Sequence, residues 1–213
     1  MSSDALAHDD FGLGTFNHLD GEMVVLDGIC HHLRSDGSAS VASPADRTPF
    51  AAVTLFKPET TIDVAGPASR SDITGLIEGA IKTTNLVQAI RIDGTFSHVK
   101  TRTVQEQKPP YPPLTAATAN EPITEFHRLA GTLAGYRMPD YEQGISVAGY
   151  HLHFVNQPRT HGGHSLDFAL ERGEIAVSTS SELHLSLPRT EAFLTAQMSL
   201  ADVAQQIHRT EGA

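Results

Sequence analysis

The sequence predicts an α+β fold in which β-sheet dominates. After residue 131, short apolar segments alternate with glycine, proline and aspartate at short intervals, which is typical of an antiparallel sheet curled into a barrel or sandwich. Only four short segments are expected to be helical. The proline-rich segment 108–114 breaks any regular element, so we expect two lobes, residues 1–115 and residues 116–213.

Three strands are expected in the first 60 residues. Residues 23–26 are an apolar run between two Asp-Gly turn signals, and residues 29–34 are the expected hairpin partner. Residues 50–56 have the length and composition of a buried strand. The first lobe is therefore expected to begin as sheet.

A helix and two further strands are expected in the rest of the first lobe. Residues 71–82 carry isoleucine, leucine and alanine at helical spacing, and Ser69 or Ser71 can cap the start of this helix. Residues 86–92 have β-branched side chains at alternate positions and end at Asp93-Gly94, a turn signal. We therefore expect a strand, a turn and a second strand through Val99.

The second lobe is expected to be rich in strands. Residues 121–130 resemble a helix, with Asn120 as its cap and Pro122 in its first turn. Two short helices are expected near the end of the chain, at residues 190–196 and 200–208. Five strands are expected between the helix at residues 121–130 and the helix at residues 190–196. They lie at residues 132–138, 145–156, 164–170, 174–179 and 182–187.

The composition excludes several classes of protein. The chain of 213 residues has a formal net charge of -10, which argues against nucleic acid or an acidic membrane surface as a partner. The single cysteine, Cys30, allows neither an intramolecular disulfide nor a cysteine-based zinc site. We find no signal-peptide pattern at the N-terminus and no apolar run near the ~18 residues of a membrane span. We therefore expect a cytoplasmic protein.

Three histidines are the most informative feature of the sequence. His151 and His153 are one residue apart on an expected strand, so their side chains point to the same face. Residues 157–163 include one proline and two glycines, so the chain can reverse there and bring His164 beside the pair. Three imidazoles and an open fourth position are typical of catalytic zinc sites. The alternatives are a hairpin that carries histidines without a metal, and His161 as the third ligand.

Two charged residues are candidates for catalysis or substrate binding, and a third charged residue lies near the end of the sequence. Glu22 follows a glycine-rich loop at the start of a strand, where it is either a general acid/base or a solvated turn residue. Arg102 lies on a strand, where its planar fork would suit a carboxylate-bearing substrate; the alternative is an ordinary surface arginine. Glu211 lies in the terminal tail.

Together these segments resemble the α-acetolactate decarboxylase family. The similarity runs in order through most of the chain, and the histidine pattern combined with Val-Lys-Thr-Arg is its most specific part. The hairpin turn departs from the family at Pro158 and His161. The matching segments are Gly12-Leu-Gly-Thr-Phe-Asn17, Asp20-Gly-Glu22, Leu26-Asp-Gly28, Thr48-Pro-Phe50, Ile92-Asp-Gly-Thr-Phe96, Val99-Lys-Thr-Arg102, Gly131-Thr-Leu-Ala-Gly-Tyr136, His151-Leu-His-Phe154 and Gly162-Gly-His-Ser-Leu-Asp167.

The resemblance implies a role for each candidate residue. One Zn²⁺ per chain would be bound by His151, His153 and His164. Glu22 corresponds to the family's acidic residue near the metal, and Arg102 corresponds to its essential arginine. Thr15 corresponds to a threonine of the substrate site, and Glu211 corresponds to a second glutamate. Glu22, Arg102 and Glu211 would be catalytic, and Thr15, Glu22 and Arg102 would contact the substrate.

The resemblance also implies a fold and a reaction. It predicts a homodimer of two-lobed chains. The N-terminal lobe, a mixed β-sheet used in dimerisation, would supply Glu22 and Arg102, and the C-terminal open β-barrel would carry the zinc. The reaction would be decarboxylation of 2-acetolactate to acetoin and carbon dioxide through a metal-stabilised enediolate, with a glutamate as proton donor. A zinc-binding module without catalysis and a zinc hydrolase are the alternatives.

Overall fold

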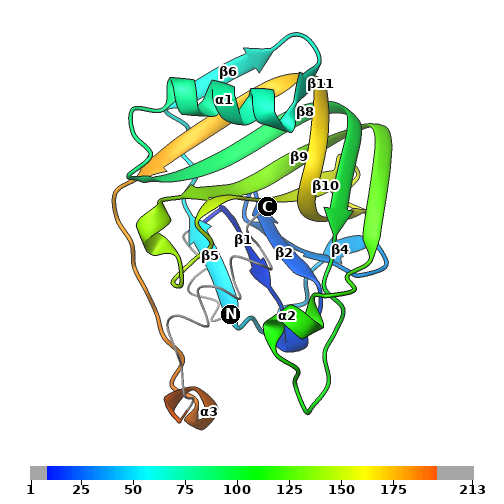
Figure 1. Cartoon of the computed structure of the whole chain (residues 1–213), viewed down its shortest axis with the longest axis vertical. Helices are drawn as coiled ribbons and strands as arrows, with labels where there is room; N and C mark the ends of the chain where they lie inside the picture. The colour runs from blue at the N-terminus through cyan, green and yellow to red at the C-terminus, as the bar shows by residue number, and fades with distance from the viewer. Residues whose placement is uncertain (1–8, 196–213) are drawn as a thin grey trace.

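The computed structural model describes residues 9–195 and consists mainly of two antiparallel β-sheets (Figure 1). The expected sheet-dominated α+β fold is confirmed. Every pairing between named strands in the described residues is antiparallel, so the expected mixed sheet in the first lobe was wrong. Short turns connect β1 to β2, β2 to β3 and β3 to β4, and such turns produce antiparallel neighbours. None of the described helices is long and apolar enough to cross a membrane.

The first sheet has the strand order β4-β3-β2-β1-β5. Its β2–β3 hairpin, which the sequence predicted, turns at Asp27 and Gly28, which both have positive φ angles, of 53° and 77°. An Asp-Gly pair adopts these angles readily and matches the twist of the flanking strands. Its strands are β1 (Phe11–Thr15), β2 (Glu22–Leu26), β3 (Ile29–Leu33), β4 (Ala39–Val41) and β5 (Phe50–Thr54).

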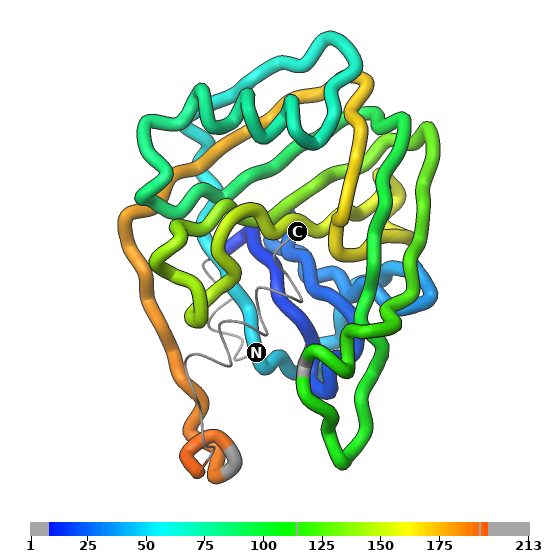
Figure 2. Tube along the Cα trace, in the orientation of Figure 1, coloured from blue at the N-terminus to red at the C-terminus, as the bar shows by residue number. Residues whose placement is uncertain are grey.

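The second sheet has the strand order β10-β9-β8-β11-β6, and β7 pairs with β11. Because β10 pairs with both β9 and β11, the four strands β8 to β11 form a ring of pairings, in loose agreement with the expected open barrel. In Figure 2, β6 lies beside the distant second half of β11. Its strands are β6 (Thr60–Val64), β7 (Ala68–Ser69), β8 (Val87–Arg102), β9 (Ile123–Met138), β10 (Gly149–Asn156) and β11 (Gly162–Ser180).

The two sheets divide the chain between β5 and β6. The hairpin of β8 and β9 spans residue 115, so the strands β6, β7 and β8 lie in the same sheet as the C-terminal strands. Candidate residues of the expected first lobe therefore come from different sheets, Glu22 from β2 and Arg102 from β8. The division into lobes at residue 115, with dimerisation through the first, stays a prediction.

Helix α1 (Arg70–Ala80) confirms the expected helix and packs on the second sheet (Figure 1). The Ser69 side chain accepts a hydrogen bond from the backbone N–H of Asp72, and the Asp72 carboxylate accepts one from the backbone N–H of Ser69. This reciprocal cap satisfies two backbone donors that the helix itself leaves unpaired. Ile73 and Ile77 are fully buried on one face of the helix, in an apolar cluster with residues of β6 and of β8 to β11.

Residues 121–130 were expected to be a helix, and this prediction was wrong, because residues 123–138 form the long strand β9. Asn120 and Pro122 resemble a helix start, but β9 pairs with β8 along its whole length, and this pairing satisfies the backbone better than an isolated helix would. Gly131 also suits a tightly packed strand, since an added Cβ would lie 2.6 Å from the Phe154 ring.

Asp93-Gly94 was expected to be a turn, and this prediction was also wrong. Strand β8 continues through both residues, which pair with β9 on one side and β11 on the other. Gly94 is required for close packing here, because an added Cβ would collide with the backbone carbonyl of Arg172.

The end of the described chain differs from the expectation. The two strands expected at 164–170 and 174–179 are one strand, β11, because both segments pair with β8, with register shifts between residues 165 and 172. Residues 182–187 form no strand, and their side chains are exposed. Of the helix expected at 190–196, the described residues include α3 (Glu191–Leu194). The helix expected at 200–208 lies outside the described residues. Three short helical turns complete the elements: η1 (Asn17–Leu19), α2 (Leu114–Ala117) and η2 (Asp140–Glu142).

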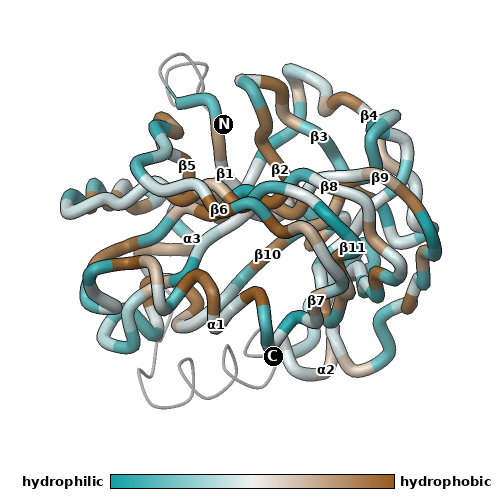
Figure 3. The backbone as a smooth tube through the Cα atoms, turned by 90° about the horizontal axis from the view of Figure 1, so that it is seen from above, coloured by the Kyte–Doolittle hydropathy of each residue, from teal (hydrophilic) through white to brown (hydrophobic). Residues whose placement is uncertain are grey.

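The two faces of β10 have different surroundings. Leu152 and Phe154 belong to the apolar cluster under α1, whereas Val155 packs with Leu13 and Val24 in the cluster between the two sheets. Figure 3 shows β2, the strand of Val24, as largely hydrophobic. Since side chains alternate along a strand, the odd-numbered residues of β10 face the first sheet.

Candidate functional site

Three buried histidines converge between the two sheets. His153 on β10 lies directly opposite His164 on β11, and His151 is two residues from His153 on the same face. One ring nitrogen from each side chain lies within 4.8 Å of the other two. The exposed fractions of the three residues are 8% for His151, 0% for His153 and 2% for His164. This arrangement supplies three ligand atoms at one point.

The turn between β10 and β11 brings His164 to the other two histidines. The Asn156 side-chain oxygen accepts hydrogen bonds from the backbone N–H groups of Thr160 and His161, which closes the turn. The turn contains Arg159 at a positive φ of 60°. His161 lies in this turn with an exposed side chain, and its Nδ1 contacts Thr160 Oγ1 at 3.0 Å. His161 is therefore not a member of the buried cluster.

Burial keeps the three imidazoles neutral. It lowers the pKa of His153 to about 4, with Arg102 as a further cause, although a backbone hydrogen bond acts in the opposite direction. Burial also lowers the pKa of His151 and His164 well below the usual value, and neighbouring histidines and Arg102 lower it further. Only a neutral imidazole has a nitrogen lone pair that can bind a metal ion. At neutral pH the cluster is therefore in the form that binds metal.

A hydrogen bond orients the ring of His153. Its Nδ1 lies 2.8 Å from the backbone carbonyl oxygen of Met23 on β2, so Nδ1 carries the proton and donates it. The Nε2 lone pair then points to the cluster, where Nε2 of His151 lies 3.1 Å away. A carbonyl that fixes the tautomer of a ligating histidine is typical of metal sites. The donor set of three neutral, buried nitrogens fits zinc.

Glu22 is the first residue of β2 and lies at this cluster. Its Oε2 is 3.7 Å from Nε2 of His153, and its side chain is 12% exposed. The adjacent residue, Met23, supplies the carbonyl that orients His153. This environment differs from that of a solvated turn glutamate.

Arg102 ends β8 directly opposite His164. It is close enough that its positive charge lowers the pKa of all three histidines. Its Nε lies 3.1 Å from Oε2 of Glu121, and the side chains are 17% and 5% exposed, respectively. An arginine in this position provides a positive charge beside the histidine cluster.

Thr15 lies next to Glu22 because it is paired with Glu22 across the β1–β2 ladder. Its hydroxyl donates a hydrogen bond of 2.7 Å to the Gly21 carbonyl. The structure thus brings Thr15, Glu22 and Arg102 to the neighbourhood of the three histidines. Glu211 lies outside the described residues.

The sequence reasoning missed Glu121. This residue was expected to start a helix and instead forms a buried ion pair with Arg102. A glutamate directly before a proline was the available signal, because the residue before proline favours an extended backbone over a helical one.

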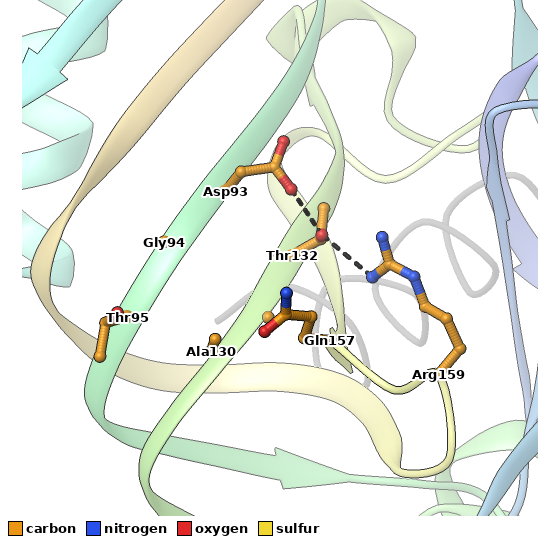
Figure 4. A pocket seen from close by; sticks show the side chains of 8 residues that line it. Asp93, Gly94, Thr95, Ala130, Thr132, Gln157 and Arg159 are labelled. Atoms are coloured by element: carbon orange, nitrogen blue, oxygen red, sulfur yellow. Dashed lines mark hydrogen bonds between the residues drawn. The ribbon is translucent and has the colours of Figure 1, made fainter.

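The surface cavity in Figure 4 is separate from the histidine cluster. Its volume is about 430 Å³, and none of the three clustered histidines lines it. Its charged groups already satisfy one another: Arg159 donates to the Thr132 hydroxyl at 3.0 Å, and this hydroxyl donates to Asp93 at 2.6 Å. None of the residues that line this cavity therefore belongs to the histidine cluster.

Comparison with known proteins identifies close relatives. The family model described as alpha-acetolactate decarboxylase matches residues 1–200. The chain is 44% identical to the alpha-acetolactate decarboxylase of Klebsiella aerogenes over 209 residues, which cover 98% of this chain and 80% of that protein. For the protein of the same name from Bacillus subtilis strain 168, the identity is 42%, with coverage of 96% and 80%.

Solved structures have the same fold. The crystal structure of alpha-acetolactate decarboxylase from Bacillus subtilis strain 168 matches with a TM-score of 0.95 and 41% identity, covering 99% of this chain and 90% of that one. A Staphylococcus aureus protein of unknown function, described as similar to alpha-acetolactate decarboxylase, matches with a TM-score of 0.93 and 29% identity, covering 98% and 90%.

Proposed function

Because the chain belongs to the alpha-acetolactate decarboxylase family, we propose that it converts 2-acetolactate to acetoin and carbon dioxide with the help of a bound zinc ion. The observation that carries this proposal is the convergence of three buried, neutral histidines with a carboxylate and an arginine from different strands. The family gives the reaction, and these residues supply the groups that it needs.

The three histidines would hold the zinc ion. His151, His153 and His164 supply three nitrogens, and a site with three protein ligands keeps positions open for substrate oxygens. A zinc ion held there would act as a Lewis acid that stabilises negative charge on the substrate's ketone oxygen.

Arg102 would bind the substrate's carboxylate. In 2-acetolactate the carboxylate is attached to a carbon that carries a hydroxyl group and lies next to a ketone. When the bond to the carboxylate carbon breaks, its electron pair moves toward the ketone, carbon dioxide leaves and an enediolate remains. A guanidinium opposite His164 holds the carboxylate beside the cluster until this bond breaks.

A glutamate would complete the reaction by protonating the enediolate carbon. Glu22 is the first candidate because its Oε2 lies 3.7 Å from Nε2 of His153, and Glu211 is the second candidate from the resemblance. The donor must carry a proton when carbon dioxide leaves. Delivery to one face of a planar enediolate would produce acetoin of a single handedness.

We further propose a cytoplasmic homodimer. Leu183, Leu185 and Leu187 occupy alternate positions in residues 182–187 and are 56%, 58% and 61% exposed. Three exposed leucines within five residues offer apolar surface that a second chain would cover. The proposed cytoplasmic location rests on the single cysteine, Cys30, because a chain without an intramolecular disulfide suits a reducing compartment.

An acetoin assay tests the proposed reaction. Racemic 2-acetolactate is incubated with the protein as purified, after removal of metal with a chelator, and after zinc is added back. We expect acetoin formation that the chelator abolishes and zinc restores. Zinc-replete protein that forms no acetoin would indicate a binding module instead, and activity that the chelator does not affect would exclude the metal role.

A further inference from the structure

Glu121 is held beside Arg102 by the backbone. Arg102 pairs with Ile123 in the β8–β9 ladder, and the N–H of Thr103 donates to the carbonyl of Pro122 at 3.2 Å. Glu121 directly precedes these paired residues, and its own backbone is restricted because a proline follows it. The position of Glu121 relative to Arg102 is therefore set by the sheet and not by the side chains alone.

The ion pair constrains the plane of the guanidinium. Oε2 of Glu121 lies 3.1 Å from Nε of Arg102, and the Glu121 side chain is only 5% exposed. A buried carboxylate is costly unless it is paired, so the contact is difficult to exchange for water. The guanidinium is a rigid planar fork with more than one edge that can bind a carboxylate. Because Glu121 contacts Nε, we expect a second carboxylate to bind at the Nη1–Nη2 edge.

This orientation matters because Arg102 is directly opposite His164 in the β8–β11 ladder, and an arginine side chain is long and flexible. An arginine that is free to rotate would spend part of its time with its charge directed away from the substrate, and reordering it would reduce the binding energy. Holding its side chain in advance avoids that cost.

We propose that Glu121 is a positioning residue that fixes the Arg102 guanidinium so that its terminal edge receives the substrate's carboxylate. This proposal rests on the proposed function, because it presumes that Arg102 binds a carboxylate. It assigns no direct contact with the substrate to Glu121.

Substitution of Glu121 tests the proposal through separate measurements of KM and kcat. Glu121→Gln removes the charge and keeps the shape, and we expect KM to rise about tenfold while kcat changes less than about threefold. Zinc content should remain that of the unsubstituted protein, and the melting temperature should stay above the assay temperature although loss of the ion pair lowers it. The matched control is Glu125→Gln, four residues further along the chain, because Glu125 is exposed and paired with Lys100 in the ladder. This control should leave KM unchanged.

A double-substitution cycle separates positioning from a merely structural role. In an Arg102→Lys protein the planar fork is gone, so adding Glu121→Gln should change KM less than about twofold. Independent, multiplicative effects of the two changes would overturn the proposal, as would an unchanged KM in Glu121→Gln alone. If Glu121→Gln fails to fold, Glu121→Asp decides instead: a raised KM with retained kcat is expected, and an unchanged KM would overturn the proposal.

The failure of the proposed function would be distinguishable. If the unsubstituted, zinc-loaded protein forms no acetoin, the decarboxylase proposal fails whatever the variants do. The positioning role is then tested by calorimetry with 2-hydroxyisobutyrate, a 2-hydroxy acid that lacks the ketone. Weaker binding in Glu121→Gln than in Glu125→Gln supports positioning, and equal binding in both variants overturns it.

Discussion

Arg102 lies directly opposite His164 in the antiparallel pairing of β8 with β11. On its other side His164 faces His153, so three residues from three strands form one row across the sheet. The arginine and two of the proposed ligands are therefore held by the same ladder of backbone hydrogen bonds. This row places a carboxylate-binding group beside a metal-binding cluster.

Replacement of His153 by alanine should abolish zinc binding and acetoin formation. This residue is 0% exposed, and its ring is oriented by the Met23 carbonyl, so no other side chain can take over its position easily. We expect activity to fall by a factor of about 10³ or more, because one missing ligand removes the metal and its stabilisation of charge. Zinc per chain and acetoin formation are measured on the same samples.

The matched control for this prediction is His161→Ala. His161 lies in the turn and is exposed, so its removal should leave zinc content and activity close to those of the unsubstituted protein. Loss of zinc in His161→Ala with retention in His153→Ala would contradict the proposed set of ligands.

The stability of the metal-free protein should fall as the pH falls from about 6.5 to about 4. The pKa of His153 is about 4 in the folded protein, because burial opposes its charged form, and its usual value is 6.5. Between these values the unfolded chain binds more protons than the folded chain, so protonation favours unfolding. His153 alone would cost about 3 kcal/mol over this range.

Denaturant unfolding at a series of pH values checks this prediction. The metal-free protein should show a shallower pH dependence when His153 is replaced by glutamine, which cannot titrate. An identical pH dependence in both proteins would show that His153 titrates normally. Above pH 7 the contribution from this residue should be constant.

Replacement of Glu22 by glutamine should leave zinc bound and slow the reaction. The amide keeps the shape of the side chain beside His153 but cannot supply the proton. Loss of a general acid lowers kcat by a factor of about 10² to 10⁴. Chiral chromatography of the acetoin from Glu22→Gln and Glu211→Gln identifies the donor. The variant that lacks the donor no longer delivers the proton to one face, so it should produce both enantiomers of acetoin. Full activity and a single enantiomer of acetoin in both variants would contradict the proton-donor role.

Replacement of Leu185 by aspartate should weaken the proposed dimer. Leu185 is 58% exposed and lies between two other exposed leucines, so a charge there would be buried in any interface that covers the segment. Light scattering during gel filtration should show a smaller mass for this variant at low concentration. An unchanged dimer, or a monomer in the unsubstituted protein, would contradict this use of the segment.

Local signals in the sequence were sufficient for some elements of the fold. The β2–β3 hairpin follows from Asp27-Gly28, and α1 follows from its apolar spacing and the Ser69 cap. Where the prediction failed, pairing with distant strands decided the structure. Asn120 and Pro122 have the form of a helix start, yet β8 pairs with the residues that follow them. Asp93-Gly94 has the form of a turn, yet strands on both sides keep it extended.

The same distinction applies to the candidate site. The three histidines could be brought together from sequence because one hairpin carries them, and a turn between two strands is a local feature. Glu22 and Arg102 were candidates from their local sequence, but only the resemblance assigned them to the metal site, because they reach the cluster from other strands. The contact between Glu121 and Arg102 depends on the β8–β9 pairing, which the expected helix had excluded.

A zinc titration of the metal-free protein tests most directly whether the histidine cluster holds the catalytic metal. Bound zinc and the rate of acetoin formation from 2-acetolactate are measured after each addition, for the unsubstituted protein and for His153→Ala. The account predicts that activity rises in proportion to bound zinc and is complete at one zinc per chain, with neither binding nor activity in the variant. Full activity before zinc is added, or one tightly bound zinc without acetoin formation, would contradict it.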